Sequence, residues 1–370
     1  MTKLIEVCDV QYGYPFDSKL FSESDGMPLI RIRDVVRGYS ETFTTEDYKP
    51  EYVVHQGDIL IGMDGEFNIA KWGGIPALLN QRVCRIFPQE EVDSDYIFHA
   101  LPKALKEIEN RTAFVTVKHL SAKEINKITI PIPPLEQQRQ IAAILNTLQS
   151  IIVHRKQQLA KLDELVKARF VEMFGDPMTN PLNWKKDNAE HHIDLLSGYP
   201  FKSEQYVDSG VNICGGLIIM PQRIEWDSCV HWATTKGYEE YLLAKGDIVM
   251  ALDRPWITEG FKIALVDGEH LPALLIQRTA RIRATDINQK YLYHCFINGG
   301  FDKHTNITGS LVPHISAKDI KSFEIMLPPI DLQTQFAAFV EQNDKSKVAV
   351  QKALDEAQLL FDSLMQEYFG

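Results

Sequence analysis

The sequence predicts an α+β protein with two similar globular domains separated by two long antiparallel helices, which form a coiled coil, and with an internal pseudo-two-fold repeat. Three observations predict this class: a segment that occurs in both halves of the chain, a proline-free heptad pattern after each copy, and short apolar runs bounded by turn residues. We place globular domains at residues 1–134 and 176–329, and helices at residues 135–175 and 330–370.

The repeat is clearest in its last third. Residues 120–145 (LSAKEINKITIPIPPLEQQRQIAAIL) recur as residues 315–340 (ISAKDIKSFEIMLPPIDLQTQFAAFV), with 11 identities in 26 positions. A period of about half the chain indicates two copies of one unit, because the repeats of solenoids are much shorter. Upstream of this segment, three motif pairs recur: GYPF at 13–16 and 198–201, GDILIGMD at 57–64 and GDIVMALD at 246–253, and NQRVCRI at 80–86 and IQRTARI at 276–282. The number of residues between the two copies differs from pair to pair, which indicates loops of different length.

Each repeated segment leads into a predicted long helix. No proline lies between Pro134 and Pro177, and none follows Pro329. About 40 residues at a rise of about 1.5 Å give a rod of roughly 60 Å, and Gly175 supplies a left-handed end. Apolar residues recur at alternating steps of four and three, the seam of a coiled coil. The seam and docking positions are Ile141, Leu145, Leu148, Ile152, Leu159, Leu162 and Val166 in the first helix, and Val350, Leu354, Phe361 and Leu364 in the second.

The globular segments have the composition of mixed domains. Apolar content of 45% over 370 residues is ample for two cores. Helices are predicted over residues 93–110 and 286–300, and strands over short runs between turn residues, at 59–61, 83–86, 248–250 and 281–283.

Membrane and secretory signals are not found. No apolar run approaches the ~18 residues of a membrane span, and no signal peptide opens the sequence. No C-x-x-C pair occurs among the five cysteines, which we expect to be reduced and mostly buried in a cytoplasmic protein: Cys8, Cys84, Cys214, Cys229 and Cys295.

The charge is acidic. The net charge is −11, both globular segments have more acidic than basic residues, and only the first helix has a basic excess. A nonspecific DNA binder needs a broad basic surface. A sequence reader inside a larger complex needs only a few arginine, lysine and amide side chains at base edges. Net charge by itself does not decide between a nucleic-acid partner and none.

Two carboxylate pairs are the best enzymatic candidates, Asp58 with Asp64 and Asp247 with Asp253. Such pairs can bind Mg²⁺. Along an extended strand, however, positions i and i+6 lie about 20 Å apart, far beyond the ~4 Å of a two-metal site. We therefore interpret the first aspartate of each pair as a turn cap and the second as the end of a strand.

Other catalytic motifs are lacking in the sequence. His191, His192 and Asp194 have no second spaced pair of ligands, and we interpret them as a solvated entry segment of the second domain. Neither an Asn/Asp-Pro-Pro-Tyr-like tetrapeptide of an amino-methyltransferase nor a G-x-x-x-x-G-K-[ST] phosphate loop occurs. We predict no catalytic residue, no metal and no cofactor.

The duplicated motif resembles the specificity subunit of type I restriction–modification enzymes. The resemblance covers essentially the whole chain and rests on IPPLEQQ at 132–138 and LPPIDLQ at 327–333, each of which leads into a long helix, and on the Gly-Asp-Ile-Leu and Gly-Asp-Ile-Val strand openings. Leu332 stands where the first copy has Gln137, a departure that we expect to weaken a local contact.

The resemblance implies that each globular domain is a target-recognition domain for one half of a split double-stranded DNA site, with a nonspecific spacer between the halves. Half-site centres that are one DNA turn apart are separated by about 34–36 Å. This distance is shorter than the predicted helices, so the helices can set it. The resemblance also implies adenine methylation by a partner modification (methyltransferase) subunit, of which the pseudo-symmetry recruits two copies, and restriction (translocase/nuclease) subunits that join through the complex. The chain itself is then not an enzyme.

Three alternatives stay open. The chain resembles equally a specificity subunit of a smaller, non-translocating restriction–modification system. A self-contained nuclease or methyltransferase is disfavoured by the missing motifs. A structural adaptor that binds no DNA is kept open by the acidic charge.

Basic and amide side chains cluster in both globular domains, and arginine pairs with guanine as asparagine and glutamine pair with adenine. Individually, we interpret most of them as solvated or phosphate-contacting residues. The candidates are Arg31, Arg33, Lys71, Gln81, Arg82, Lys118 and His119 in the first domain, and Arg254, Gln277, Arg278, Lys303, His304 and His314 in the second. The same clusters contain Arg37, Trp72, Thr116, Trp256, Lys262 and Asn306.

The helices carry two further signals. Arg155 and Arg169 interrupt the first seam, and we favour pairing with acids or amides across the helices over contact with DNA. Apolar residues outside the seam, Ile144, Ile151 and Phe170, are expected to be exposed and predict poor solubility without the modification partner.

Overall fold

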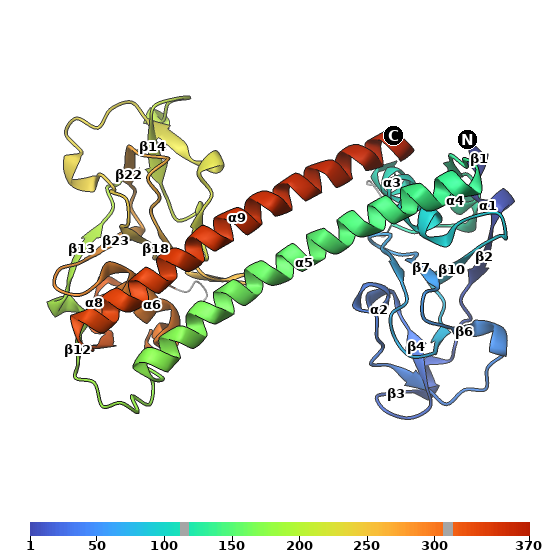
Figure 1. Cartoon of the computed structure of the whole chain (residues 1–370), viewed down its shortest axis with the longest axis horizontal. Coiled ribbons are helices and arrows are strands. Elements are labelled where there is room, and N and C mark those ends of the chain that lie inside the picture. The colour runs from blue at the N-terminus through green and yellow to red at the C-terminus, as the bar shows by residue number, and fades with distance from the viewer. Residues whose placement is uncertain (112–117, 306–313) are drawn as a thin grey trace. The chain divides into compact units, whose positions relative to one another are not determined.

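The computed structural model describes residues 1–111, 118–305 and 314–370. The chain divides into two compact units, which we call unit 1 (Met1–Gln157 with Gln351–Gly370) and unit 2 (Gln158–Val350). Each unit contains one globular module and one part of each long helix, α5 (Leu135–Phe174) and α9 (Ile330–Phe369) (Figure 1). No helix in the described ranges is long and apolar enough to cross a membrane.

Unit 1 is built on two sheets. An antiparallel four-stranded sheet has the order β2-β10-β7-β8 and packs its core against α3, and a five-stranded sheet has the order β3-β5-β4-β9-β6. The strands are β1 (Thr2–Lys3), β2 (Cys8–Tyr12), β3 (Phe21–Ser22), β4 (Met27–Ile30), β5 (Phe43–Thr44), β6 (Val53–Val54), β7 (Ile59–Gly62), β8 (Ile69–Lys71), β9 (Ala77–Leu79), β10 (Val83–Pro88) and β11 (Thr129–Ile130). The helices are α1 (Leu4–Val7), α2 (Ile32–Arg37), α3 (Ser94–Arg111) and α4 (Ala122–Ile125).

Unit 2 has an antiparallel four-stranded sheet of order β13-β23-β18-β21 and a three-stranded sheet of order β17-β14-β22. The strands are β12 (Lys186–Asn188), β13 (Ile193–Ser197), β14 (Val211–Cys214), β15 (Ile219–Met220), β16 (Arg223–Ile224), β17 (Val230–Trp232), β18 (Ile248–Ala251), β19 (Trp256–Ile257), β20 (Gly260–Phe261), β21 (Ile263–Leu265), β22 (Ala273–Leu275), β23 (Thr279–Ala284) and β24 (Glu324–Met326). The helices are α6 (Gln289–Asn298), α7 (Phe301–His304) and α8 (Ala317–Lys321).

The two modules repeat the same topology. The four-stranded sheets correspond strand by strand, and the parallel pair β4–β9 recurs as β14–β22. The pair β1–β11, which joins the start of the module to the segment before the long helix, recurs as β12–β24. Small hairpins such as β15–β16 and β19–β20 occur in unit 2. Extra strands of this kind account for the unequal offsets of the sequence motifs.

A buried glutamine anchors each long helix to its module. Gln138, 1% exposed, donates through Nε2 to the Pro133 carbonyl (2.8 Å) and accepts from the Asp93 backbone N–H (2.9 Å). Gln333, 3% exposed, makes the same two bonds to the Pro328 carbonyl and the Asn288 N–H, both 2.8 Å. Because this second glutamine of the motif is present in both copies, the anchor is intact in both.

The neighbouring motif position behaves differently from our expectation. Leu332, which replaces the polar Gln137 of the first copy, packs against the core of unit 2. The expected loss of a local contact was wrong, because an apolar side chain at this position gains packing while Gln333 holds the helix start.

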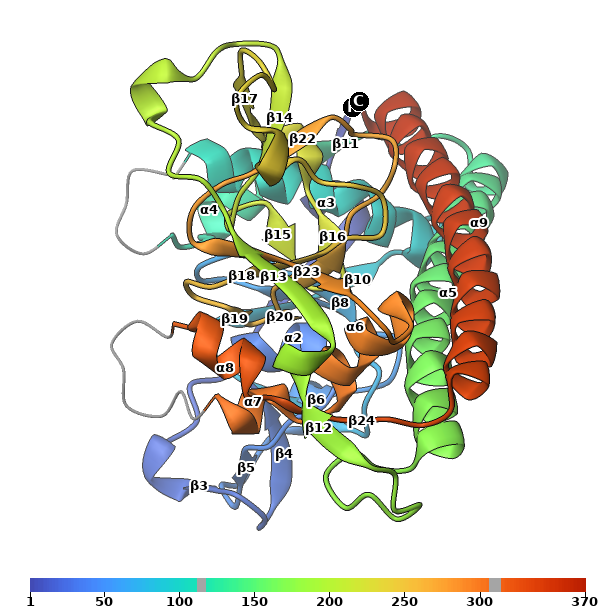
Figure 2. The same ribbon diagram turned by 90° about the vertical axis from the view of Figure 1, so that its left-hand side faces the viewer.

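The long helices run antiparallel within each unit. In unit 1, Ile141 and Leu145 near the start of α5 share a core with Phe369 at the end of α9. In unit 2, Phe174 at the end of α5 lies against Phe336 near the start of α9, with ring centroids 5.5 Å apart. Both views show the helices side by side (Figures 1 and 2). At the end of α5, Gly175 has φ +78°, the predicted left-handed stop.

Most of the positions assigned to the seam are buried. The buried ones are Ile141, Leu145, Leu148, Ile152, Val166, Val350 and Leu354, and the half-buried ones are Leu159, Leu162, Phe361 and Leu364. Asn343, a polar seam residue, is 5% exposed and donates to the Leu162 carbonyl at 3.2 Å. Lys347 forms an ion pair with Asp163 of α5. These polar pairs across the helices fix the register in unit 2.

Two expectations about α5 were wrong. Phe170 was expected to be exposed but is fully buried, because α5 also packs against the module of unit 2 and a second apolar stripe faces that module. Arg169 was expected to find an acid across the helices, but its ion pair is with Glu172 on its own helix (2.7 Å). Its guanidinium does reach the other helix, where it lies 5.7 Å from the ring centroid of Phe339. Ile144 and Ile151 are exposed as expected.

The cysteines are free thiols, and four of the five are buried. Burial raises the pKa of the Cys8, Cys84 and Cys295 thiols to about 12. Because the thiolate is the reactive form, these groups act as packing residues, and their burial as free thiols agrees with the sequence prediction.

His294 makes unit 2 sensitive to acid. The side chain lies on α6, is 7% exposed and packs against the Phe336 ring. Burial, with nearby Lys347 and Lys290, lowers its pKa from 6.5 to about 3. The unfolded chain therefore binds a proton below pH 6.5 that the folded chain binds only near pH 3, so stability falls as the pH drops through this window.

We expect acidification from pH 7.5 to pH 5 to lower the free energy of unfolding by about 2 kcal/mol through His294 alone. A His294→Gln variant, neutral at both pH values, lacks this contribution. Urea unfolding of both proteins at the two pH values measures the difference, and an identical pH dependence in the two would contradict the assignment.

Candidate nucleic-acid interface

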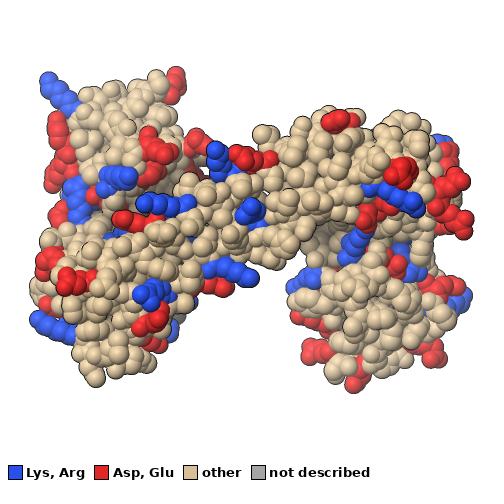
Figure 3. Space-filling view, viewed as in Figure 1, with Lys and Arg blue, Asp and Glu red and all other residues tan. Residues whose placement is uncertain are grey.

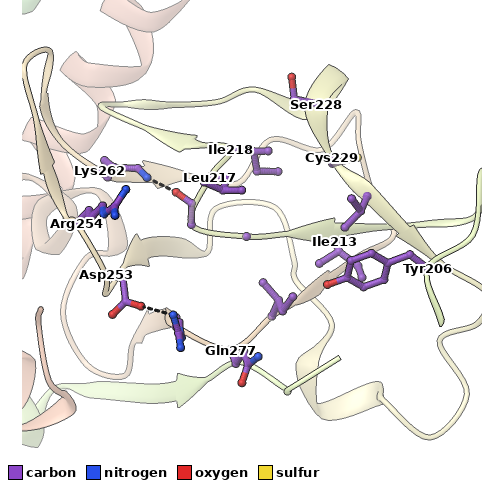
Figure 4. A pocket seen from close by; sticks show the side chains of 15 residues that line it. Tyr206, Ile213, Leu217, Ile218, Ser228, Cys229, Asp253, Arg254, Lys262 and Gln277 are labelled. Carbon is purple, nitrogen blue, oxygen red and sulfur yellow. Dashed lines mark hydrogen bonds and ion pairs between the residues drawn. The ribbon is translucent and has the colours of Figure 1, made fainter. Parts of the chain in front are cut away.

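The same cluster of aspartate, histidine and arginine occurs in both units. In unit 1, His119 Nδ1 lies 2.6 Å from Asp64 Oδ1, and Arg82 Nη1 lies 3.6 Å from the same oxygen. In unit 2, His314 Nδ1 lies 2.7 Å from Asp253 Oδ1, and Arg278 Nη1 lies 3.1 Å from Asp253 Oδ2. Figure 4 shows Asp253 joined to the arginine by a dashed line. The histidine and arginine of each cluster were predicted to contact DNA.

Local structure brings these residues together. Asp64 and Asp253 follow the central strands β7 and β18, and each forms an isolated antiparallel bridge with its histidine. The arginine lies in the tight turn between β9 and β10, or between β22 and β23. Its carbonyl accepts from the backbone N–H of Met63 (2.8 Å) in unit 1. In unit 2 the donor is the N–H of Leu252 (3.0 Å).

Both turns hold an arginine in the left-handed region. The φ angles are +73° for Arg82 and +63° for Arg278, a conformation that costs free energy for residues other than glycine. The turn is held by its neighbours: the Gln81 N–H donates to the Tyr14 carbonyl at 2.9 Å, and the Gln277 N–H donates to the Tyr199 carbonyl at 2.8 Å. The strained conformation therefore occurs twice, with the same side chain each time.

The repeated Gly-Tyr-Pro-Phe motif supports this turn. A Cβ atom on Gly13 would lie 2.0 Å from the Asn80 carbonyl oxygen, and one on Gly198 would lie 1.9 Å from the Ile276 carbonyl oxygen. Only glycine permits this approach. The motif thus positions the arginine turn in each unit.

A cavity adjoins each arginine turn. The cavity of unit 1 has a volume of about 570 Å³, and Arg31, Arg33, Gln81 and Arg82 line it. The cavity of unit 2 has a volume of about 640 Å³, and its lining includes Arg254, Gln277 and Arg278. The structure therefore gathers seven of the predicted DNA-contacting residues at two equivalent places.

The remaining surface charge is mixed. On the face in Figure 3, lysine and arginine side chains alternate with aspartate and glutamate over both modules, and no broad basic area appears among the described residues of that view. Such a surface does not favour tight nonspecific binding of nucleic acid. It suits recognition through a few localised cations.

The family model described as type I restriction modification DNA specificity domain matches residues 1–164 and 199–357. The chain belongs to this family. Its relatives include the type I restriction enzyme EcoBI specificity subunit of Escherichia coli, 40% identical over 163 residues, which are 44% of this chain and 34% of that protein. The MjaVIII specificity subunit of Methanocaldococcus jannaschii is 24% identical over 364 residues, covering 88% of this chain and 86% of that protein.

The fold agrees with solved specificity subunits. A crystal structure of the S subunit of a type I restriction–modification system from M. genitalium superimposes with a TM-score of 0.63 and 13% identity, over 100% of this chain and 95% of that chain. A chain from a structural study of complex assembly and conformational transition of the type I R-M system superimposes with a TM-score of 0.54 and 17% identity, over 100% of this chain and 96% of that chain. The predicted α+β class, the duplicated domains and the family resemblance are confirmed.

The homologues of the chain are thus specificity subunits of type I restriction enzymes, the function predicted from the sequence. The match to the EcoBI subunit spans only about a third of that protein, at 34%. Nothing in the described ranges groups three or more histidine, cysteine, aspartate or glutamate side chains into a metal site.

The other residues that the sequence predicts to contact DNA lie away from the two cavities. Lys71 forms an ion pair with Asp95, and Lys118 with Glu109 at 2.9 Å. Arg37 is paired with Glu41 at 3.1 Å. His304 Nε2 lies 3.1 Å from the Asp319 carbonyl oxygen and from Ser322 Oγ, and Lys303 is exposed on the same helix, α7.

Four further candidates from the same clusters have different outcomes. Trp72 is 1% exposed and donates to the Ile75 carbonyl, so it is a core residue. Trp256 is stacked on Phe261, with ring centroids 4.8 Å apart. Thr116 and Asn306 lie outside the described residues.

The interpretation of the carboxylate pairs is confirmed. Asp58 Oδ2 accepts from the His55 N–H, and Asp247 Oδ2 accepts from the Ala244 N–H, both at 2.8 Å. Each also pairs with an arginine of the sheet, Asp58 with Arg85. The two aspartates are therefore turn caps.

The interpretation of the histidine pair was partly wrong. His191 is exposed, but His192 is 9% exposed and lies 2.8 Å from Asp286 Oδ1. His192 is thus a buried residue with carboxylate partners, Asp286 and Asp187, and not part of a solvated segment.

Sequence reasoning missed the role of two residues in the site. The sequence analysis considers Asp64 and Asp253 as metal ligands and interprets them as strand ends, whereas in the structure they hold the predicted histidines and arginines. Their recurrence beside the Gln-Arg pair in both copies was an available signal. The cavity residues Asn68 and Asn80 of unit 1 were not singled out, since isolated asparagines carry no pattern.

Proposed function

We propose that this chain is the DNA-specificity subunit of a type I restriction–modification enzyme, which reads a bipartite double-stranded DNA target with a nonspecific spacer. Residues 1–134 form the recognition domain for one half-site and residues 176–329 that for the other, and the helices at 135–175 and 330–370 separate them. The observation that carries the proposal is the arginine turn beside a cavity, which occurs once in each unit of a chain from the DNA specificity family.

The chemistry of the turn supports DNA contact. Guanidinium and amide groups are the side chains that bind phosphate oxygens and base edges. In each unit the aspartate pairs with only part of the guanidinium, and the arginine and its neighbouring glutamine are exposed. The exposed donors therefore remain available to a nucleic acid. In unit 1 the histidine also lies beside the arginine, with His119 Nδ1 3.2 Å from Arg82 Nη1.

The partners are two copies of the modification subunit, one for each unit, together with restriction subunits that join through the complex. Catalysis resides in these partners, and the chain works in the cytoplasm, where its target DNA lies. Exposed apolar side chains on the helix segments support docking there. They are Ile144 (45% exposed), Ile151 (39%), Val153 (46%) and Leu359 (73%) in unit 1, and Leu165 (49%), Val171 (43%) and Val348 (70%) in unit 2.

Methylation mapping tests the proposal. Genomic DNA from cells that express this chain with a matching modification subunit is expected to carry methyl-adenine at a two-part motif with a fixed gap. Exchange of residues 1–134 for another recognition domain is expected to change one half of the motif and leave the other half and the gap unchanged.

Two results would contradict the proposed function. If the complex is shown to be assembled and no new methylated motif appears, the chain does not direct modification. A methylated but continuous motif would contradict the assignment of one half-site to each unit.

A further inference from the structure

The two cavities occupy the same place in the repeated fold. In unit 1 the cavity lies between the segment after β4, the residue before β8 and the arginine turn with Gln81 and Arg82. In unit 2 it lies between the segment after β14, the residue before β21 and the arginine turn with Gln277 and Arg278. The residue before the strand is Asn68 in unit 1 and Lys262 in unit 2. The Asn68 carbonyl accepts a hydrogen bond from the Gly62 N–H at the end of β7 (2.8 Å). The Lys262 carbonyl accepts the equivalent bond from the Ala251 N–H at the end of β18 (3.0 Å). Asn68 and Lys262 are therefore equivalent positions.

The linings divide into a common part and a variable part. The Gln-Arg pair is identical in both units, while the segment after the strand is Arg31-Ile32-Arg33 in one and Gly215-Gly216-Leu217 in the other. A side chain that is the same in both units is suited to contact the phosphate backbone, because both half-sites have the same backbone. A side chain that differs between them suits what distinguishes the half-sites, which is the base sequence.

Lys262 has an unusual environment. It is 7% exposed, and its Nζ donates to the Gly216 carbonyl, as Figure 4 shows. Among the described residues, no carboxylate lies within ion-pair distance of it, and burial lowers the pKa of its ammonium group. Buried ammonium groups are normally paired with an acid, because an unpaired one destabilises the fold.

The free donors of Lys262 face a cavity. An ammonium group has three donors and no acceptor, and one donor is used by Gly216. The glycines at 215 and 216 place no side chain over it, and the cavity of about 640 Å³ gives room for an incoming group. The apolar side chains of Ile213 and Ile218 line the same cavity, and a hydrogen bond is stronger in apolar surroundings than in water.

We propose that Lys262 and Asn68 are the specificity-determining residues of the two cavities: Lys262 selects guanine through its O6 and N7 acceptors, and Asn68 selects adenine through N6 and N7. Lysine offers only donors and asparagine offers both a donor and an acceptor, which matches these base edges. The inference rests on the proposed function and names, for each half-site, one side chain that selects one base.

Reciprocal variants, Lys262→Asn and Asn68→Lys, test the inference in the complete complex with the modification subunit. Methylated motifs are mapped for the wild type and each variant. Lys262→Asn is expected to change one guanine position in the half-site of unit 2 and to lower methylation of the original motif roughly 10- to 100-fold. Asn68→Lys is expected to change one adenine position in the other half-site. The matched control is Lys236→Asn, an exposed lysine of unit 2 outside the cavity, which should leave the motif unchanged.

The outcomes separate this inference from the proposed function. A wild-type complex without a bipartite motif refutes the proposed function. A wild-type motif that both variants retain overturns only the inference. Uniformly weaker methylation of an unchanged motif also overturns it, since that result indicates a phosphate contact. Should Lys262→Asn fail to assemble, Asn68→Lys decides alone, because Asn68 is only half-buried.

Discussion

Replacement of Arg278 by alanine is expected to weaken binding of the assembled complex to all duplexes about tenfold, or ~1.4 kcal/mol, without altering the methylated motif. The equivalent arginine, Arg82, occupies the same left-handed turn in unit 1. Because the two units are proposed to read different half-sites with the same arginine, we expect that arginine to contact a feature common to all DNA. The loss of one phosphate contact should also reduce the slope of log affinity against log salt by about 0.9.

The measurement is a titration of the complex with duplexes that contain or lack the target, at several salt concentrations. Arg82→Ala should behave like Arg278→Ala, and Lys236→Ala, an exposed lysine away from the turn, should bind like the wild type. Asp253→Asn removes the carboxylate that holds Arg278 and should give a smaller loss. A loss confined to target duplexes, or a changed base in the motif, would contradict a phosphate contact and assign Arg278 to base reading.

Replacement of Phe170 by alanine is expected to lower the free energy of unfolding of unit 2 by about 3–5 kcal/mol. Its ring is fully buried, with centroids 5.1 Å from Phe174, 5.5 Å from Phe336 and 5.8 Å from Tyr291. Truncation leaves a cavity in a core to which both long helices and α6 contribute. Edge-on and stacked ring contacts are lost together with the buried apolar area.

The next residue provides the matched control. Val171 is 43% exposed on the same helix, so Val171→Ala should change the stability of the chain by less than about 0.5 kcal/mol. Denaturant unfolding of the full chain measures both variants. Similar small losses in the two would show that α5 does not form part of the core of unit 2.

The helices and the repeat were predictable from the sequence because they depend on local or periodic information. Heptad spacing, the absence of proline after Pro134 and Pro329, and the glycine at residue 175 set the course and end of the helices. The strands Ile59–Gly62 and Ile248–Ala251 were predicted over residues 59–61 and 248–250, from short apolar runs between turn residues. The family motif was visible because it occurs twice and precedes a helix each time.

The candidate site was predictable only in part. Arginine, glutamine and histidine were recognised as DNA-binding types, but residue type does not say which side chains converge. Asp64 and His119 are 55 residues apart and Asp253 and His314 are 61 apart, and only the folded sheets bring them within hydrogen-bond distance. The same tertiary packing pairs Lys71 and Lys118 with acids of α3 and buries Trp72.

By itself, the sequence determined that the chain is a duplicated α+β protein with two 40-residue helices and the motif of a specificity subunit. Tertiary structure alone decided that Phe170 is buried, that Asp64 and Asp253 hold the arginine turns, and that Lys262 lies in a cavity without an acidic partner among the described residues. The reason is physical: periodicity reports the local conformation of the backbone, whereas burial and pairing depend on segments that are distant in the chain and meet only when it folds.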